Sequence, residues 1–127
     1  MAENSVELVR RAYETWNADG LDAFAARTAE SLELVDAPQL PDAGVWHGRA
    51  VVMARLADVA EAVGGTWVDI RDVRAAGSEV LVSMMWREDP SPGSGEIGEV
   101  FHLARVTDDR IDRVRVFTDA DSALAAS

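Results

Sequence analysis

The sequence lacks several residue types, and each absence excludes a kind of chemistry. It has no cysteine, so disulfides, thiolate nucleophiles and thiolate metal sites are excluded. All 12 basic residues are arginines, and without a lysine amine no lysine Schiff base can form with a carbonyl substrate. The two histidines have no acidic residue at ligand spacing, so we expect neither a metal site nor a cofactor.

The chain is also short of positive charge and of long apolar runs. Its 23 acidic residues against 12 basic ones leave a net charge of −11, which opposes binding to nucleic acid. The apolar runs are too short to span a bilayer, and the N-terminus lacks the basic-then-apolar order of a secretory signal. We therefore expect one cytoplasmic domain, residues 1–127, that binds neither nucleic acid nor membrane.

Apolar periodicities divide the chain into helices followed by strands. Helical spacing predicts helices at residues 4–16, 21–27 and 48–64, and a short helical tail after residue 118. Period-two alternation predicts strands at residues 31–35, 66–74, 79–87, 95–106 and 110–118. The proline-containing segments 36–44 and 89–95 are expected to be loops. We predict an α+β fold, in which a curved, mostly antiparallel sheet of about five strands packs against three helices.

One ionisable side chain, His102, falls where strand alternation predicts a buried residue. An imidazole in that place can act as a general acid or base near neutral pH. The alternative is a structural histidine, whose ring is satisfied by a backbone carbonyl or by Asp36. The four tryptophans, with Met84 and Met85, indicate a broad apolar pocket suited to a planar ligand. The alternative, preferred for Trp67, is that tryptophans fill a small core.

Three segments carry a resemblance to a known family. They are YETWNADGLDAF at 13–24, GVWHGRAVV at 44–52 and DDRIDRVRVFTDADSAL at 108–124. Together with the order of elements, they resemble the SnoaL-like branch of the nuclear transport factor 2-like superfamily. The resemblance implies a cone, whose helices and curved sheet enclose one pocket. Members include polyketide cyclases, ketosteroid isomerases, limonene epoxide hydrolases, dehydratases and non-catalytic binding or association domains.

The resemblance assigns inward faces to the predicted elements. The residues it places around the pocket are Ala12, Trp16, Val82, Met84, Trp86, Val100, His102, Ala104, Val114, Val116 and Thr118. It places Asp36 at the rim, and Trp46, in the loop before Gly48, over the mouth. His47, in the same loop, is expected to be solvated.

The resemblance also suggests chemical roles. His102 falls where ketosteroid isomerases place an oxyanion-hole acid, and Asp36 lies near the place of their proton-abstracting base. An acid and an imidazole in one apolar pocket would suit proton transfer next to a carbonyl, in a cyclisation or isomerisation. The alternative for Asp36 is a residue that caps the proline loop. The isomerases' oxyanion tyrosine falls on Ala12, and Tyr13 is expected to point about 100° away around the helix.

Other functions remain open at this point. A binding or association domain without turnover is the main alternative. A second is an epoxide hydrolase of the limonene epoxide hydrolase type, for which Arg87 and Asp89 match part of the Asp–Arg–Asp set while Val116 replaces the remaining aspartate.

A homodimer is expected through the outer sheet face, where arginines alternate with apolar residues. These outer residues are Phe101, Leu103, Arg105, Arg113, Arg115 and Phe117. The alternative for that face is an ordinary solvated surface.

Overall fold

The computed structural model describes residues 2–40, 42–64, 67–89, 91 and 95–127. Its helices are α1 (Ala2–Asp19), α2 (Leu21–Ala25), α3 (Arg49–Val63) and α4 (Ala120–Ala126). Its strands are β1 (Thr28–Val35), β2 (Val45–His47), β3 (Trp67–Ala76), β4 (Glu79–Arg87), β5 (Glu96–Thr107) and β6 (Arg110–Phe117). The predicted strand start at Thr66 and most of the predicted 89–95 loop lie outside the described residues.

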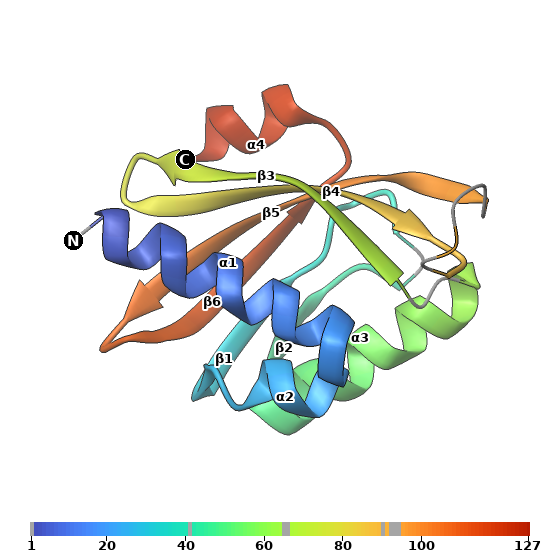
Figure 1. The fold of residues 1–127 in the computed structure, drawn as a ribbon, viewed down its shortest axis with the longest axis horizontal. Coiled ribbons are helices and arrows are strands. Elements are labelled where there is room, and N and C mark those ends of the chain that lie inside the picture. The colour runs from blue at the N-terminus through green and yellow to red at the C-terminus, as the bar shows by residue number, and fades with distance from the viewer. Residues whose placement is uncertain (1, 41, 65–66, 90, 92–94) are drawn as a thin grey trace.

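The strands form one curved sheet in the order β2-β1-β6-β5-β4-β3 (Figure 1). Every neighbouring pair is antiparallel except β1 and β6, which run parallel. The predicted α+β class and the mostly antiparallel sheet are therefore confirmed. Within the described residues the sheet has six strands, one more than expected, because the three-residue β2 pairs with β1 through Leu34 and Trp46. Three residues are too few to show an alternation in sequence.

The sheet separates two layers of helices. Figure 1 shows α1, α2 and α3 on one side of the sheet and α4 on the other. The larger core cluster lies between the sheet and the first three helices, and a smaller one lies under α4. Because both faces are covered, β4 is buried along nearly its whole length, with Val82 and Met84 in the larger core and Leu81 in the smaller. Within the described residues, no helix combines the length and the apolar character needed to cross a membrane.

The outer face of the sheet differs from the expectation. Helix α4, whose N-terminus is capped by the Asp119 side chain, covers Leu103, which is fully buried, and Phe101, which is 8% exposed. Beside it, the carboxylate of Glu79 binds the guanidinium groups of Arg113 and Arg115. Much of the face proposed for a dimer is therefore engaged within the chain. The dimer itself stays a prediction.

Helix α1 extends three residues beyond its predicted end, and its last turn fastens it to the sheet. The Asn17 amide group donates to the Val68 carbonyl, and the Val68 N–H donates to Asn17 Oδ1 at 3.0 Å. Val68 lies on β3, an edge strand of the sheet, so one side chain replaces the missing neighbouring strand at this point. Gly20 follows with φ 89°, a left-handed conformation that favours glycine, and the chain turns into α2.

Replacing Asn17 with Asp should destabilise the fold although the shape of the side chain is kept. The substitution removes the donor to the Val68 carbonyl and sets a carboxylate oxygen against it. We expect the free energy of unfolding, measured with urea, to fall by about 1–3 kcal/mol. Asn4→Asp, on the exposed first turn of the same helix, is the control and should cost nothing. Equal stability of the two variants would contradict the role given to Asn17.

Candidate functional site

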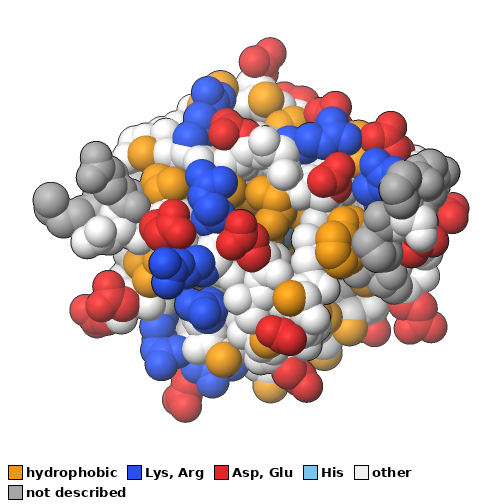
Figure 2. Space-filling model, viewed as in Figure 1, with side chains coloured by type: hydrophobic (Ala, Val, Ile, Leu, Met, Phe, Trp, Pro, Cys, Tyr) orange, Lys and Arg blue, Asp and Glu red, His pale blue; other side chains and the backbone are white. Residues whose placement is uncertain are grey.

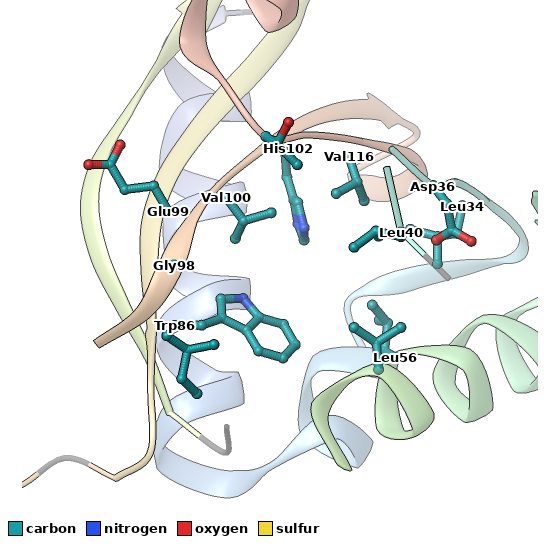
Figure 3. A pocket seen from close by; sticks show the side chains of 13 residues that line it. Leu34, Asp36, Leu40, Leu56, Trp86, Gly98, Glu99, Val100, His102 and Val116 are labelled. Atoms are coloured by element: carbon teal, nitrogen blue, oxygen red, sulfur yellow. The ribbon is translucent and has the colours of Figure 1, made fainter. Parts of the chain in front are cut away.

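A cavity of about 170 Å³ lies between α3, the loop after β1, and strands β4, β5 and β6. Its wall is almost entirely apolar, with a few polar groups (Figure 3). The lining residues are Leu34, Asp36, Leu40, Leu56, Val59, Trp86, Ile97, Gly98, Glu99, Val100, His102, Val116 and Thr118. An apolar cavity with few polar groups is the usual form of a small-molecule site.

His102 projects from the middle of β5, between Val82 on β4 and Val116 on β6. Its ring points into the cavity from the sheet side, towards Trp86 and Leu56 (Figure 3). The residue is only 3% exposed, and its Nδ1 lies 2.7 Å from the hydroxyl oxygen of Tyr13 on α1. This bond leaves Nε2 as the ring nitrogen available to a molecule in the cavity.

The expectation that Tyr13 points away from this site does not hold. Ala12 and Tyr13 are both fully buried, because α1 lies in the concave face of the sheet and α2 covers its other side. Tyr13 packs against Trp16, Phe24 and the edge of the His102 ring, and its hydroxyl reaches the imidazole. A helix buried on a broad face directs adjacent positions into the core, so Ala12 and Tyr13 can both face inward.

Burial determines the charge state of this pair. Loss of water around the imidazole lowers the pKa of His102 from 6.5 to about 4, and burial raises the pKa of Tyr13. Both side chains are therefore neutral at pH 7. A neutral imidazole has one N–H donor and one acceptor nitrogen, so the Tyr13 bond decides which of these Nε2 presents to the cavity.

Asp36 also lines the cavity, but its carboxylate already has protein partners. The residue is 7% exposed, and Oδ2 accepts hydrogen bonds from Trp46 Nε1 at 2.8 Å and from the Gly44 N–H at 3.2 Å. The same oxygen forms an ion pair with Arg55 Nη2 at 2.9 Å, and the Arg55 guanidinium lies over the Trp46 ring, 4.9 Å from its centroid. Asp36 thus ties α3 to the loop after β1, and Leu40 in this loop lines the cavity.

The structure brings six of the thirteen predicted site residues to this cavity. Those that line it are Asp36, Trp86, Val100, His102, Val116 and Thr118. Six others are buried in the core, namely Ala12, Trp16, Val82, Met84, Ala104 and Val114. Trp46 contacts Asp36 without lining the cavity. The α3 residues Leu56 and Val59 complete the opposite wall, and Ile97, Gly98 and Glu99 form part of the opening. Helical spacing identifies Leu56 and Val59 as core-facing, but which core residues border a cavity depends on packing.

A second cavity, of about 490 Å³, adjoins the first at Trp86. It lies at the corner between α1 and α2, against the second half of α3 and the first residues of β3. Its lining residues are Trp16, Asn17, Gly20, Leu21, Ala57, Ala60, Glu61, Trp67, Val68 and Trp86. Trp67, expected to fill the core, is thus half-buried at a cavity wall. Hydrophobic side chains gather towards the middle of the face seen in Figure 2, with arginines and acidic residues around them.

Two other kinds of site find little support in the described residues. In this part of the chain, no group of three or more histidine or acidic side chains is arranged to hold a metal ion. Arg87 and Asp89, which match part of the epoxide hydrolase set, do not line the first cavity. Arg87 forms long ion pairs with Asp69 and Glu96, and Asp89 is exposed. His47 is exposed beside Glu33.

A curved sheet packed against helices is the fold that solved nuclear transport factor 2-like proteins also have. Comparison with known families agrees. The chain belongs to the SnoaL-like domain family, whose model matches residues 9–114. No curated protein matches the chain.

Solved structures show the same fold at low sequence identity. TerC, co-crystallised with polyporic acid, is 18% identical with a TM-score of 0.72, over 98% of this chain and 99% of TerC. A protein named as a SnoaL-like polyketide cyclase, from Jannaschia sp. CCS1, is 19% identical with a TM-score of 0.69, over 98% of this chain and 92% of its own. A nuclear transport factor 2-like protein from Mesorhizobium loti is 18% identical with a TM-score of 0.69, over 94% and 93%.

The buried histidine should make stability depend on pH in a defined window. Between pH 6.5 and about 4, the unfolded chain binds a proton at His102 and the folded chain does not. The free energy of unfolding should therefore fall as the pH is lowered, by about 3 kcal/mol across the window. Urea unfolding of His102→Gln should lack this part of the loss, whereas His47→Gln, at the exposed histidine, should behave as wild type. A His102→Gln curve parallel to wild type would contradict the neutral buried imidazole.

Proposed function

We propose that the protein is a small cofactor-independent enzyme that binds an apolar, polyketide- or terpenoid-like carbonyl compound and catalyses proton transfer next to the carbonyl. The reaction class is a cyclisation or isomerisation. The observation that carries the proposal is the buried His102–Tyr13 pair at the wall of an apolar cavity. The SnoaL-like family and its polyketide cyclase neighbours support the same reaction class.

His102 would act through Nε2, as a neutral hydrogen-bond donor. When the Tyr13 hydroxyl donates to Nδ1, Nε2 carries the ring proton and can donate it to a ligand carbonyl oxygen. Negative charge grows on that oxygen when a proton leaves the neighbouring carbon. A donor fixed in dry surroundings stabilises this charge without reorganising, and in many enzymes such stabilisation contributes more to catalysis than any other effect. Tyr13 is then a positioning residue, because it selects the tautomer and holds the ring.

Asp36 is the second group proposed for proton transfer, as the acceptor of the proton that leaves carbon. Its carboxylate lines the same cavity as His102, across from Leu56 and beside Leu40 (Figure 3). The ion pair with Arg55 offsets the buried negative charge and fixes the orientation of the carboxylate. An apolar ligand in the cavity would therefore contact the Asp36–Arg55 ion pair, in which the two charges balance, rather than an unpaired carboxylate. The assignment places the proton donor and acceptor on opposite sides of one bound molecule.

The alternative function is a small-molecule binding or association domain without turnover. The observation that favours it is that both titratable groups are already held by protein partners, His102 by Tyr13 and Asp36 by Arg55 and Trp46. In that case His102 is a polar anchor for the ligand carbonyl, and Asp36 only fastens the loop. An epoxide hydrolase is the weakest candidate, because Val116 stands at the cavity wall where that mechanism needs an aspartate.

The nature of the wall favours a neutral, ring-containing ligand. Apolar side chains dominate it, and the cation beside it, Arg55, is paired with Asp36. The neutral imidazole adds no charge. TerC was co-crystallised with polyporic acid, and this supports a small organic molecule as the class of ligand to test.

Proton transfer can be tested with acetophenone, whose methyl protons lie next to an aryl ketone. In heavy water, NMR should show loss of the methyl proton signal faster with the protein than in buffer. His102→Ala should lower the protein-dependent rate by roughly 10²–10³-fold, the usual cost of losing an oxyanion donor. Tyr13→Phe should lower the rate less and leave the affinity for acetophenone near wild type, because Tyr13 does not touch the ligand.

The control for this assay is His47→Ala, at the exposed histidine, which should exchange like wild type. Asp36→Asn tests the proposed acceptor separately and should also slow exchange. A wild-type rate equal to that of buffer, with acetophenone bound, would leave only the binding function. A protein-dependent rate that survives both His102→Ala and Asp36→Asn would refute the assignment of these two groups.

A homodimer through the outer sheet face belongs to the same proposal. The dimer would form through the part of this face that neither α4 nor the ion pairs of Glu79 with Arg113 and Arg115 cover. Light scattering at micromolar concentration should give the mass of two chains, and Arg105→Glu, on the exposed part of that face, should lower it. A mass of one chain, near the 13.7 kDa of the sequence, would exclude the dimer.

A further inference from the structure

Trp86 stands between the two cavities and belongs to the wall of both. It projects from β4, and its ring meets the Trp16 ring edge-on, with the ring centroids 6.3 Å apart. On the other side, the indole faces the cavity that His102 enters (Figure 3). Among the described residues, Trp86 is the one that lines both cavities, and its indole ring separates them.

The indole N–H of Trp86 has no hydrogen-bond partner among the described residues. The residue is 8% exposed, and Nε1 is fully buried without an acceptor within reach. Most buried polar groups in proteins are paired, and an unpaired one costs about 1–3 kcal/mol. In Figure 3 this nitrogen lies on the side of the indole that faces His102. The present position of the ring is therefore held by packing alone, without a polar anchor.

The strand neighbours leave the indole room to turn. On β5 the residue opposite Trp86 is Gly98, which has no side chain, and a Cβ built on Gly98 would meet nothing within 4 Å. Gly98 also lines the first cavity. A bulky residue at this cross-strand position would pack against the ring and hold it. The glycine instead leaves open space on the β5 side.

The volumes indicate that the first cavity does not act alone. The first cavity holds about 170 Å³, below the roughly 300–1,000 Å³ of most ligand sites. The second holds about 490 Å³ but is rimmed by Glu61 and by Asn17, whose amide is already bonded to Val68. Of the polar groups suited to a carbonyl, His102 lines the first cavity, and the Trp86 N–H belongs to the residue that borders both cavities.

We propose that the two cavities form one ligand site, in which Trp86 is a movable partition. The ligand is elongated, with apolar rings at both ends and a hydrogen-bond acceptor between them. One ring occupies the His102 cavity and the other lies between Trp16 and Trp67. The acceptor binds the Trp86 indole N–H, which becomes accessible when the ring turns towards Gly98. This assignment deepens the proposed function and rests on carbonyl binding in the His102 cavity.

Two ketones of different length test the proposal. Acetophenone has one ring beside its carbonyl, and dibenzyl ketone has a ring on each side. Calorimetry should show tighter binding of dibenzyl ketone to the wild-type protein. Ala60→Phe, which fills the second cavity from α3, should weaken dibenzyl ketone at least tenfold and leave acetophenone unchanged. Ala54→Phe, on the exposed face of the same helix, is the matched control and should bind both ketones as wild type does.

The role of Trp86 as a partition can be tested separately, by ketone affinity and by NMR. Trp86→Phe removes the donor and keeps an aromatic ring, and it should weaken dibenzyl ketone about tenfold, the value of one hydrogen bond. Acetophenone binding should weaken less, because the short ligand loses only contact with the ring and no hydrogen bond. In NMR spectra the Trp86 indole N–H signal, assigned by its absence in Trp86→Phe, should move downfield with dibenzyl ketone only.

The outcomes separate the two proposals. Unchanged dibenzyl ketone affinity in Ala60→Phe, or an indole signal that does not move, overturns the joint site, and so does a wild-type protein that does not bind dibenzyl ketone. If acetophenone exchange depends on His102 while Ala60→Phe has no effect, only the joint site fails. If Ala60→Phe acts as expected while exchange equals that of buffer, the joint site stands and the catalytic function fails.

Discussion

The hydrogen bond between Tyr13 and His102 is the constraint on which the interior of this protein depends. It joins the first helix to the middle of the sheet across 89 residues of sequence, and both partners are buried. Neither polar group could be buried alone without losing the free energy of a hydrogen bond to water. The pair therefore admits a polar ring into an apolar interior, and it fixes which nitrogen of that ring faces the cavity.

The cavity owes its shape to a second polar cluster on the opposite side. This cluster connects the loop after β1 to α3 and consists of Asp36, Arg55 and Trp46. The negative charge of Asp36 and the positive charge of Arg55 balance each other. Leu40, in that loop, and Leu56, on α3, both line the cavity. Two small polar groups of side chains, one in the core and one at the rim, thus set the two walls between which a ligand would lie.

Much of the fold could be predicted from sequence because the information is local. Strand alternation locates β3 to β6 and places His102 on the inward face, and the tryptophans indicate an apolar interior. The role of Tyr13 could not be predicted, because it depends on how deeply α1 lies in the sheet. The pairing of Asp36 with Arg55, 19 residues apart, depends likewise on the path of the loop between them. The cover that α4 forms over Leu103 also arises only when the chain is packed.

The parallel pairing of β1 with β6 has a consequence for how the chain is made. Leu34 lies beside Val114, so one edge of a strand from the first third of the chain pairs with the last strand to be synthesised. Closing so long a loop is entropically slow, and the partners are synthesised far apart in time. During synthesis β1 can pair with β2, but its other edge stays unpaired until β6 leaves the ribosome. Folding of this domain is thus a late event, which cannot be completed before its sixth strand is available.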